Sequence, residues 1–157
     1  VLCDDCLDDN TNRVSFICDD AARLVCLMTR QLSKREKWST VFNSTLLVMS
    51  ILVESGEVCV VDTTLECVLE LSSKRALIRK MARLNSLLEA IARAVLNEFN
   101  AAETKRKAIQ VFWNVSQDES NLPILARTPK VLEALVAISS THAEATAMHN
   151  TRQCALQ

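Results

Sequence analysis

The residues of this chain that could bind a metal ion are its seven cysteines and two histidines. Cys3 and Cys6 have the two-residue separation found in many zinc sites, and Cys18 follows them. A structural zinc site needs four thiolate or imidazole ligands in tetrahedral geometry. The first histidine, however, is His142, and Cys18 and Cys26 follow the period of a helix. We therefore expect no metal site.

The cysteines also indicate a cellular compartment. An odd number of cysteines, several of them at helical spacing among apolar residues, is typical of free thiols that pack as small buried side chains. We expect this behaviour of Cys18, Cys26, Cys59 and Cys67. Because free thiols persist in a reducing environment, we expect an intracellular protein of the cytoplasm or nucleus.

The sequence carries no recognisable catalytic motif. It has a single glycine, which is too few for a glycine-rich loop that cradles phosphate. His142 and His149 lie in a segment of small residues, and no serine, histidine and aspartate share the spacing of a known nucleophile motif. We therefore expect no enzymatic activity and no cofactor, and a small-molecule ligand is disfavoured.

A cluster of basic residues is the strongest chemical signal. Residues 74–83 contain five basic residues and no acid, and Arg75, Arg79 and Arg83 are four residues apart. This spacing places three guanidinium groups on one face of a helix, where like charges repel slightly. Because a guanidinium can pair two oxygens at once, the stripe predicts binding of phosphate or an acidic segment. The alternative is a solvated outer helix, and nucleic acid is disfavoured because no aromatic residues are interleaved for stacking.

The composition indicates that helices carry these residues. One glycine, two prolines and no tyrosine provide few turn residues for sheets, so we expect an all-α fold. No apolar run approaches the roughly 18 residues of a membrane span. We expect helix caps at Ser39, Ser73 and Thr128 and a break near Asn85. The apolar periodicity predicts helices over about residues 13–32, 40–56, 59–72, 74–99, 103–115 and 119–126, another that opens at Thr128, and a loop over residues 139–151.

An internal repeat gives the order of these helices. Residues 115–135 resemble residues 71–91, which lie 44 positions earlier, and residues 104–110 recur as residues 151–157. A period of roughly 40 to 47 residues is typical of helical repeats. We interpret residues 1–157 as one repeat domain, and the initial Val1 suggests a fragment of a longer chain. The units are expected at about residues 11–56 (degenerate), 59–99 and 103–140, with the start of a further unit at 147–157.

One unit resembles a known repeat family. The string from Arg106 to Ser116, with Trp113-Asn114-Val115-Ser116 at its end, is followed by Ile124-Leu125-Ala126 and by apolar residues from Val131 to Ile138. This pattern resembles the armadillo repeat of catenin-like and importin-alpha-like proteins. The match is good over residues 103–140, fair over 60–94 and poor before that. Because Arg127-Thr128 replaces the glycine usual before the third helix, HEAT-like packing is an alternative.

The resemblance implies a right-handed α-solenoid of three-helix repeats. In that fold the Trp113-Asn114-Val115-Ser116 segment packs the core and the third helices line a concave groove. Packed helices lie roughly 8 to 10 Å apart, so Glu89 and Glu133 would form two rungs that hold an extended peptide. The alternative is that such residues are merely solvated or pack against neighbours. The expected outward residues are Met49, Ser50, Val53, Glu54, Leu88, Glu89, Ala92, Arg93, Leu132, Glu133, Val136 and Ala137, of which we select Ser50, Glu89, Arg93, Glu133 and Val136 as partner-binding residues.

Together these features predict a protein-interaction scaffold. We expect it to bind an extended, acidic or phosphorylated peptide along the groove, with the Arg75, Arg79 and Arg83 stripe as a second contact. One alternative is a helical regulatory or anchoring domain of an enzyme whose catalytic part lies outside this sequence. Another is a compact helical bundle with no groove.

Overall fold

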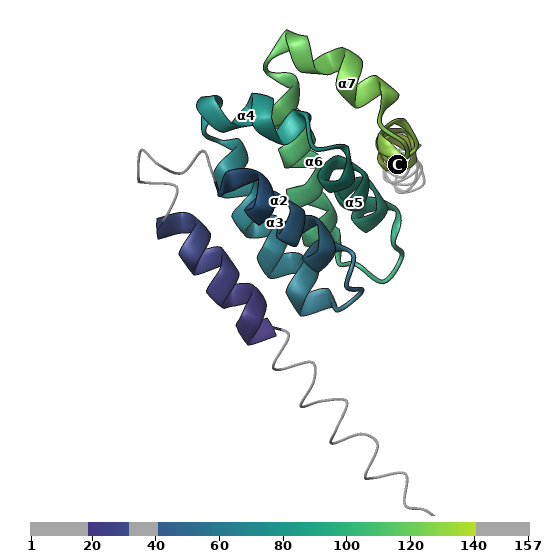
Figure 1. Ribbon diagram of the computed structural model, residues 1–157. Helices are drawn as coiled ribbons and strands as arrows, with labels where there is room; N and C mark the ends of the chain where they lie inside the picture. The colour runs from purple at the N-terminus through teal and green to yellow at the C-terminus, as the bar shows by residue number, and fades with distance from the viewer. Residues whose placement is uncertain (1–18, 32–40, 141–157) are drawn as a thin grey trace, which may run out of the picture.

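The computed structural model is built of α-helices (Figure 1). It describes residues 19–31 and 41–140, and this part of the chain contains no strand, which confirms the predicted all-α fold. No helix in these two ranges combines the length and the apolar character needed to span a bilayer. The helices are residues 19–31, α2 (Phe42–Val53), α3 (Val58–Ser72), α4 (Arg75–Ala82), α5 (Asn85–Leu96), α6 (Ala102–Ser116), the 3-10 helix η2 (Glu119–Asn121), α7 (Leu122–Arg127) and residues 131–140.

Three long helices, residues 19–31, α3 and α6, pack in succession and run in the same direction. From residues 19–31 to α3, Asp19 lies opposite Thr63 and Arg30 lies opposite Glu70. From α3 to α6, the register is set near the start by Thr104 on Asp62 and near the end by Asn114 on Ser72. α2 and α5 pack on each other beside this layer (Figure 1).

The order of elements recurs along the chain. The long, short and long helices α3, α4 and α5 are followed by α6, α7 and residues 131–140. α6 begins 44 residues after α3, at positions 102 and 58. The fold is therefore compatible with the helical repeat that the sequence predicts.

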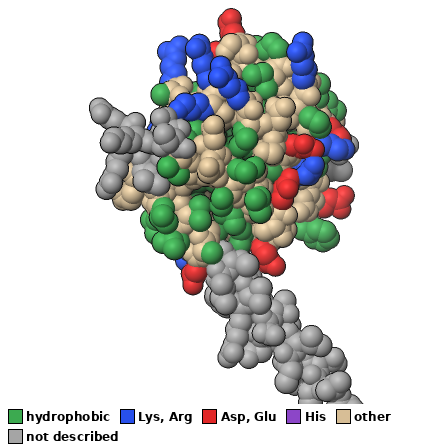
Figure 2. All heavy atoms as spheres, in the orientation of Figure 1, with side chains coloured by type: hydrophobic (Ala, Val, Ile, Leu, Met, Phe, Trp, Pro, Cys, Tyr) green, Lys and Arg blue, Asp and Glu red, His purple; other side chains and the backbone are tan. Residues whose placement is uncertain are grey.

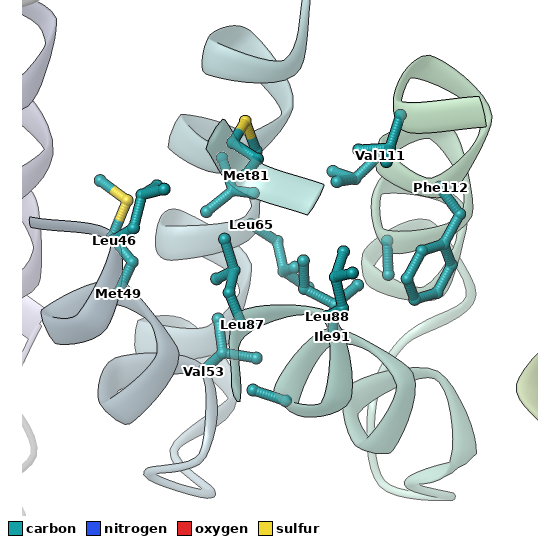
Figure 3. Packing of buried hydrophobic residues seen from close by; sticks show 14 of the residues in the cluster. Leu46, Met49, Val53, Leu65, Met81, Leu87, Leu88, Ile91, Val111 and Phe112 are labelled. Atoms are coloured by element: carbon teal, nitrogen blue, oxygen red, sulfur yellow. The ribbon is translucent and has the colours of Figure 1, made fainter. Parts of the chain in front are cut away.

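The interior is a continuous apolar cluster to which α2, α3, α4, α5 and α6 contribute. Figure 3 shows Leu65, Leu87, Ile91 and Val111 pointing toward one another from α3, α5 and α6. All four side chains are fully buried. Each such side chain contributes roughly 1.5–3 kcal/mol relative to an exposed one, so this cluster is the main force that joins the helices.

The predicted helix caps Ser73 and Thr128 are wrong. The Ser73 hydroxyl donates to the Glu70 carbonyl, and the Thr128 hydroxyl donates to the Ile124 carbonyl at 2.8 Å. Each residue immediately follows a helix, where the last carbonyls lack amide partners, so its hydroxyl serves as a donor there instead of accepting from the next helix. Ser39 lies outside the described residues.

Two further boundaries differ from the prediction. The basic stretch breaks at Arg83-Leu84, one residue before the expected Asn85, which instead begins α5. Residues 139 and 140 are helical, at the start of a segment that was expected to be a loop or partly helical, and the rest of that segment lies outside the described residues.

The cysteine prediction holds at two positions that the structure describes. Cys26 and Cys67 are buried between residues 19–31 and α3, and the Cys67 thiol donates to the Cys26 carbonyl at 3.8 Å. Cys59 is exposed, contrary to the prediction, although Val60 and Val61 in the same first turn of α3 are buried. Cys18 lies outside the described residues.

Candidate interaction surfaces

The basic surface of α4 consists of Lys74, Arg75, Arg79, Lys80 and Arg83. α4 is short and amphipathic: Leu77, Ile78, Met81 and Ala82 are buried, which turns the remaining positions toward solvent. Arg75, Arg79 and Arg83 are all exposed. Figure 2 shows Lys and Arg side chains gathered at the top of the molecule, where α4 lies in Figure 1.

The cations of the basic surface differ in their partners. Arg79 forms an ion pair with Asp118 at 2.6 Å, and the Lys80 ammonium lies 5.7 Å from the centre of the Phe42 ring. Among the residues that the structure describes, Arg75 and Arg83 form no ion pair. These two guanidinium groups can therefore meet a ligand without breaking an internal salt bridge.

Asp118 is the acid that approaches this surface from the turn after α6. The backbone amide and the hydroxyl of Ser120 both donate to its carboxylate, and Arg79 donates to it as well. Hydrogen bonds from Ser120 and from Arg79 lower the pKa of Asp118 to about 2. Asp118 is thus charged at neutral pH and neutralises only one of the α4 cations.

A polar hollow of about 420 Å³ lies beside Arg75. Its polar lining consists of Ser72, Ser73, Asn114 and Gln117 together with Arg75 and the carboxylate Asp118. The Asn114 amide donates to the Ser72 hydroxyl at 2.8 Å, which fixes the wall between α3 and α6. The hollow offers hydrogen-bonding side chains next to Arg75, which has no ion pair among the described residues, and the charged Asp118 in the same lining opposes an anion there.

The groove predicted on α2 and α5 is not open. Ser50 is only 4% exposed, and its hydroxyl donates to the Leu47 carbonyl. Met49, Val53, Leu88 and Ala92, which were also expected to point outward, are buried. The physical reason is that α2 packs directly on both α3 and α5, so these side chains fill the space between helices (Figure 3).

The charged residues of the predicted groove pair with each other. Arg93 donates to Glu89 one turn away and to Glu54 across the contact between α5 and α2. Glu133 pairs instead with Lys130 at 2.7 Å, within the start of the helix of residues 131–140. Val136 on the same helix is exposed, as expected. The structure therefore joins Glu89 and Arg93 and gives Glu133 a separate partner.

An ion-pair network that the sequence did not predict crosses the parallel helices. Arg30 contacts Glu66 and Glu70 of α3, and Lys107 of α6 contacts Asp62 at 2.8 Å. These pairs are 36 to 45 residues apart in sequence. Opposite charges separated by one repeat length were the available signal, and the pairs are consistent with the parallel register of the layer.

The structure also contains an apolar groove that the sequence did not predict. We define this groove by Ile109, Phe112, Trp113, Leu125, Leu132 and Leu135. Its volume is about 440 Å³, and it lies between α6, α7 and residues 131–140. Trp113 is 63% exposed, so the expectation that this residue packs the core is wrong. The reason is its position on the side of α6 turned away from α3. The groove is therefore an apolar surface that the described helices leave open to solvent.

No group of three histidine, cysteine or acidic side chains within residues 19–31 and 41–140 could hold a metal ion. The hydrogen bond between Cys67 and Cys26, together with burial, raises the pKa of the Cys67 thiol, so this thiol is a poor nucleophile. Comparison with known proteins finds no family model, no curated protein and no solved structure that matches this chain.

Proposed function

We propose that this chain is an armadillo-like array of helical repeats that acts as a protein-interaction scaffold. Its partner is an acidic or phosphorylated segment, held on the basic surface of α4. The observation that carries the proposal is that α4 presents basic residues and no acid on a rigid helix, with Arg75 and Arg83 free of ion pairs among the described residues.

The spacing of the arginines supports an extended partner. Successive arginines of the stripe are four residues apart, which is about 6 Å along a helix. Alternate residues of an extended peptide are separated by about 6.6 Å. A peptide with acidic or phosphorylated residues at every second position can therefore meet Arg75 and Arg83, with its intervening acidic residue opposite Arg79, which Asp118 already pairs. Each contact can be bidentate, which lysine could not provide.

The arrangement of the long helices supports the scaffold. Residues 19–31, α3 and α6 succeed one another in parallel, and α3, α4 and α5 are followed by elements of the same order. In repeat arrays each unit contacts mainly its neighbours, which produces extended surfaces suited to long ligands.

The test is direct binding of a labelled peptide with three phosphoserines at alternate positions, followed by fluorescence anisotropy. We expect Arg75→Ala with Arg83→Ala to weaken binding at least tenfold. The matched control is Arg23→Ala with Arg106→Ala, which removes the same charge from two exposed arginines elsewhere and should change affinity less than threefold. Equal losses in both double variants would reduce the effect to net charge and overturn the proposal, as would absence of binding to the parent chain.

A further inference from the structure

We propose that the apolar groove between α6, α7 and residues 131–140 binds the helix of residues 19–31 from a second copy of this chain, so that copies associate head to tail. The inference is independent of the α4 basic surface. It concerns a different face, different residues and a different kind of contact.

The groove occupies a position that is filled one repeat earlier. Leu88 and Ile91 of α5 correspond, 44 residues later, to Leu132 and Leu135 of residues 131–140. α5 packs against α6, the long helix that follows it, and both Leu88 and Ile91 are fully buried. Leu132 is 56% exposed, and Leu135 is exposed as well. The groove thus lacks, within the described residues, a long helix of the kind that α6 provides for α5; residues 151–157, whose sequence repeats residues 104–110 of α6, lie outside the described residues.

α6 shows the same difference from α3. Leu65 and Leu69 of α3 correspond to Ile109 and Trp113 of α6. Leu65 is fully buried and Leu69 packs against the core cluster, whereas Trp113 is mostly exposed. A helix seated in the groove would cover Trp113 and Leu132 together and would continue the α3 and α6 interface by one step.

The helix of residues 19–31 has the complementary surface. It turns Ala22 and Cys26 toward α3, and it leaves Leu24, Leu27 and Met28 more than half exposed on its other side. A second apolar hollow of about 270 Å³ lies between this helix and α2. Figure 2 shows apolar side chains gathered over this part of the molecule. Residues 19–31 are therefore a long helix of the correct layer with an uncovered apolar side.

The parallel order of the layer fixes how two copies meet. Since residues 19–31, α3 and α6 run in the same direction, a continued layer places residues 19–31 of one copy after α6 of another, again in parallel. The two faces are different surfaces, so the contact is heterologous, and each copy retains one unused face. This register would bring the first turn with Asp20 to the start of α6, where Arg106 already pairs with Glu103.

The test is the molar mass of the full chain by sedimentation velocity across a hundredfold range of concentration. We expect the mass to rise with concentration through dimers to longer species. One variant blocks the groove, with Leu122→Glu and Leu132→Glu, and another blocks the helix, with Leu24→Glu and Leu27→Glu. All four side chains are about half exposed, so these changes leave the interior intact. Each variant alone should be monomeric at concentrations at least tenfold above those at which the parent associates.

Mixing the two blocked variants provides the decisive result. Each retains the face that the other lacks, so the mixture should form a dimer and nothing longer. The control is Phe99→Glu, which changes an 87% exposed side chain after α5 and should associate like the parent. A parent that stays monomeric at all concentrations overturns the proposal. This is the result expected if another part of the same chain fills the groove. Dimers formed by one blocked variant alone also overturn it, because they indicate a symmetric contact.

Discussion

α5 and the helix of residues 131–140 carry the same apolar pattern 44 positions apart, and they differ in what surrounds them. Leu87 and Ala90 are buried, and so are their counterparts Val131 and Ala134. Leu88, however, is fully buried, whereas its counterpart Leu132 is mostly exposed. The comparison shows that the sequence pattern specifies which residues form the inner face of a helix. Whether the neighbouring face is buried depends on whether another helix covers it.

The largest expected effect comes from testing this pair directly. Leu88→Ala should lower the free energy of unfolding by about 2–5 kcal/mol, because it leaves a cavity in a close-packed interior. Leu132→Ala should cost less than about 1 kcal/mol in the monomer, because solvent already reaches that side chain. Urea unfolding followed by circular dichroism at low protein concentration measures both. Similar losses at the two positions would break the comparison.

Two turns with a left-handed backbone, before α3 and before residues 131–140, provide a second test. Gly56 before α3 has φ 81° and Lys130 before residues 131–140 has φ 67°, both in the left-handed region. A side chain there costs roughly 1–2 kcal/mol, so Lys130→Gly should stabilise the chain by about 1 kcal/mol, despite the loss of the exposed pair with Glu133. Gly56→Ala should destabilise it by a similar amount, since no atom lies within 4 Å of the added Cβ and only the backbone is strained.

Thermal unfolding of these two variants should therefore shift the midpoint in opposite directions. The matched control is Arg127→Gly, at a position inside the last turn of α7, where glycine lowers helix stability by about 1 kcal/mol. Stabilisation by both glycine substitutions would contradict the explanation from backbone strain at Lys130.

The link between the two units through Asp118 predicts a smaller effect that depends on pH. Ser120 and Arg79 lower the pKa of Asp118 to about 2 in the folded protein, compared with about 4 in an unfolded chain. Because the folded pKa is the lower one, this carboxylate stabilises the fold above pH 4 and loses that contribution as the pH falls from about 4 to about 2. Asp118→Asn should be less stable than the parent at pH 6, and the two should converge at pH 2. A difference that persists unchanged at pH 2 in urea titrations would exclude this charge as its source.

The smallest effect on peptide affinity is expected from Glu89 and Glu133, the two glutamates predicted from the sequence to hold an extended peptide. Glu89 is committed to Arg93, and Glu133 to Lys130. Glu89→Ala with Glu133→Ala should therefore change affinity for the phosphorylated peptide less than twofold, with helicity unchanged. Anisotropy titration of the same peptide measures this, and a tenfold loss would return the binding site to α5 and residues 131–140.

The sequence by itself determined the helices and their inner faces. A scarcity of glycine and proline and apolar residues at three- and four-residue spacing are local properties, so α3, α6 and the buried Val131 and Ala134 could be predicted without a structure, whereas Leu135, expected on the same inner face, is exposed. The exposed arginines of α4 followed from the same local reasoning, because a stripe of charges must lie opposite a buried stripe.

Only the tertiary structure decided which of the remaining faces are covered. Ser50 and Ala92 are buried because α2, α3 and α5 meet there, and Trp113 is exposed because no helix among the described residues lies on that side of α6. The physical reason is that burial depends on contacts between segments about 40 residues apart. Helical periodicity specifies which residues share a face, and the packing of neighbours determines whether water reaches it.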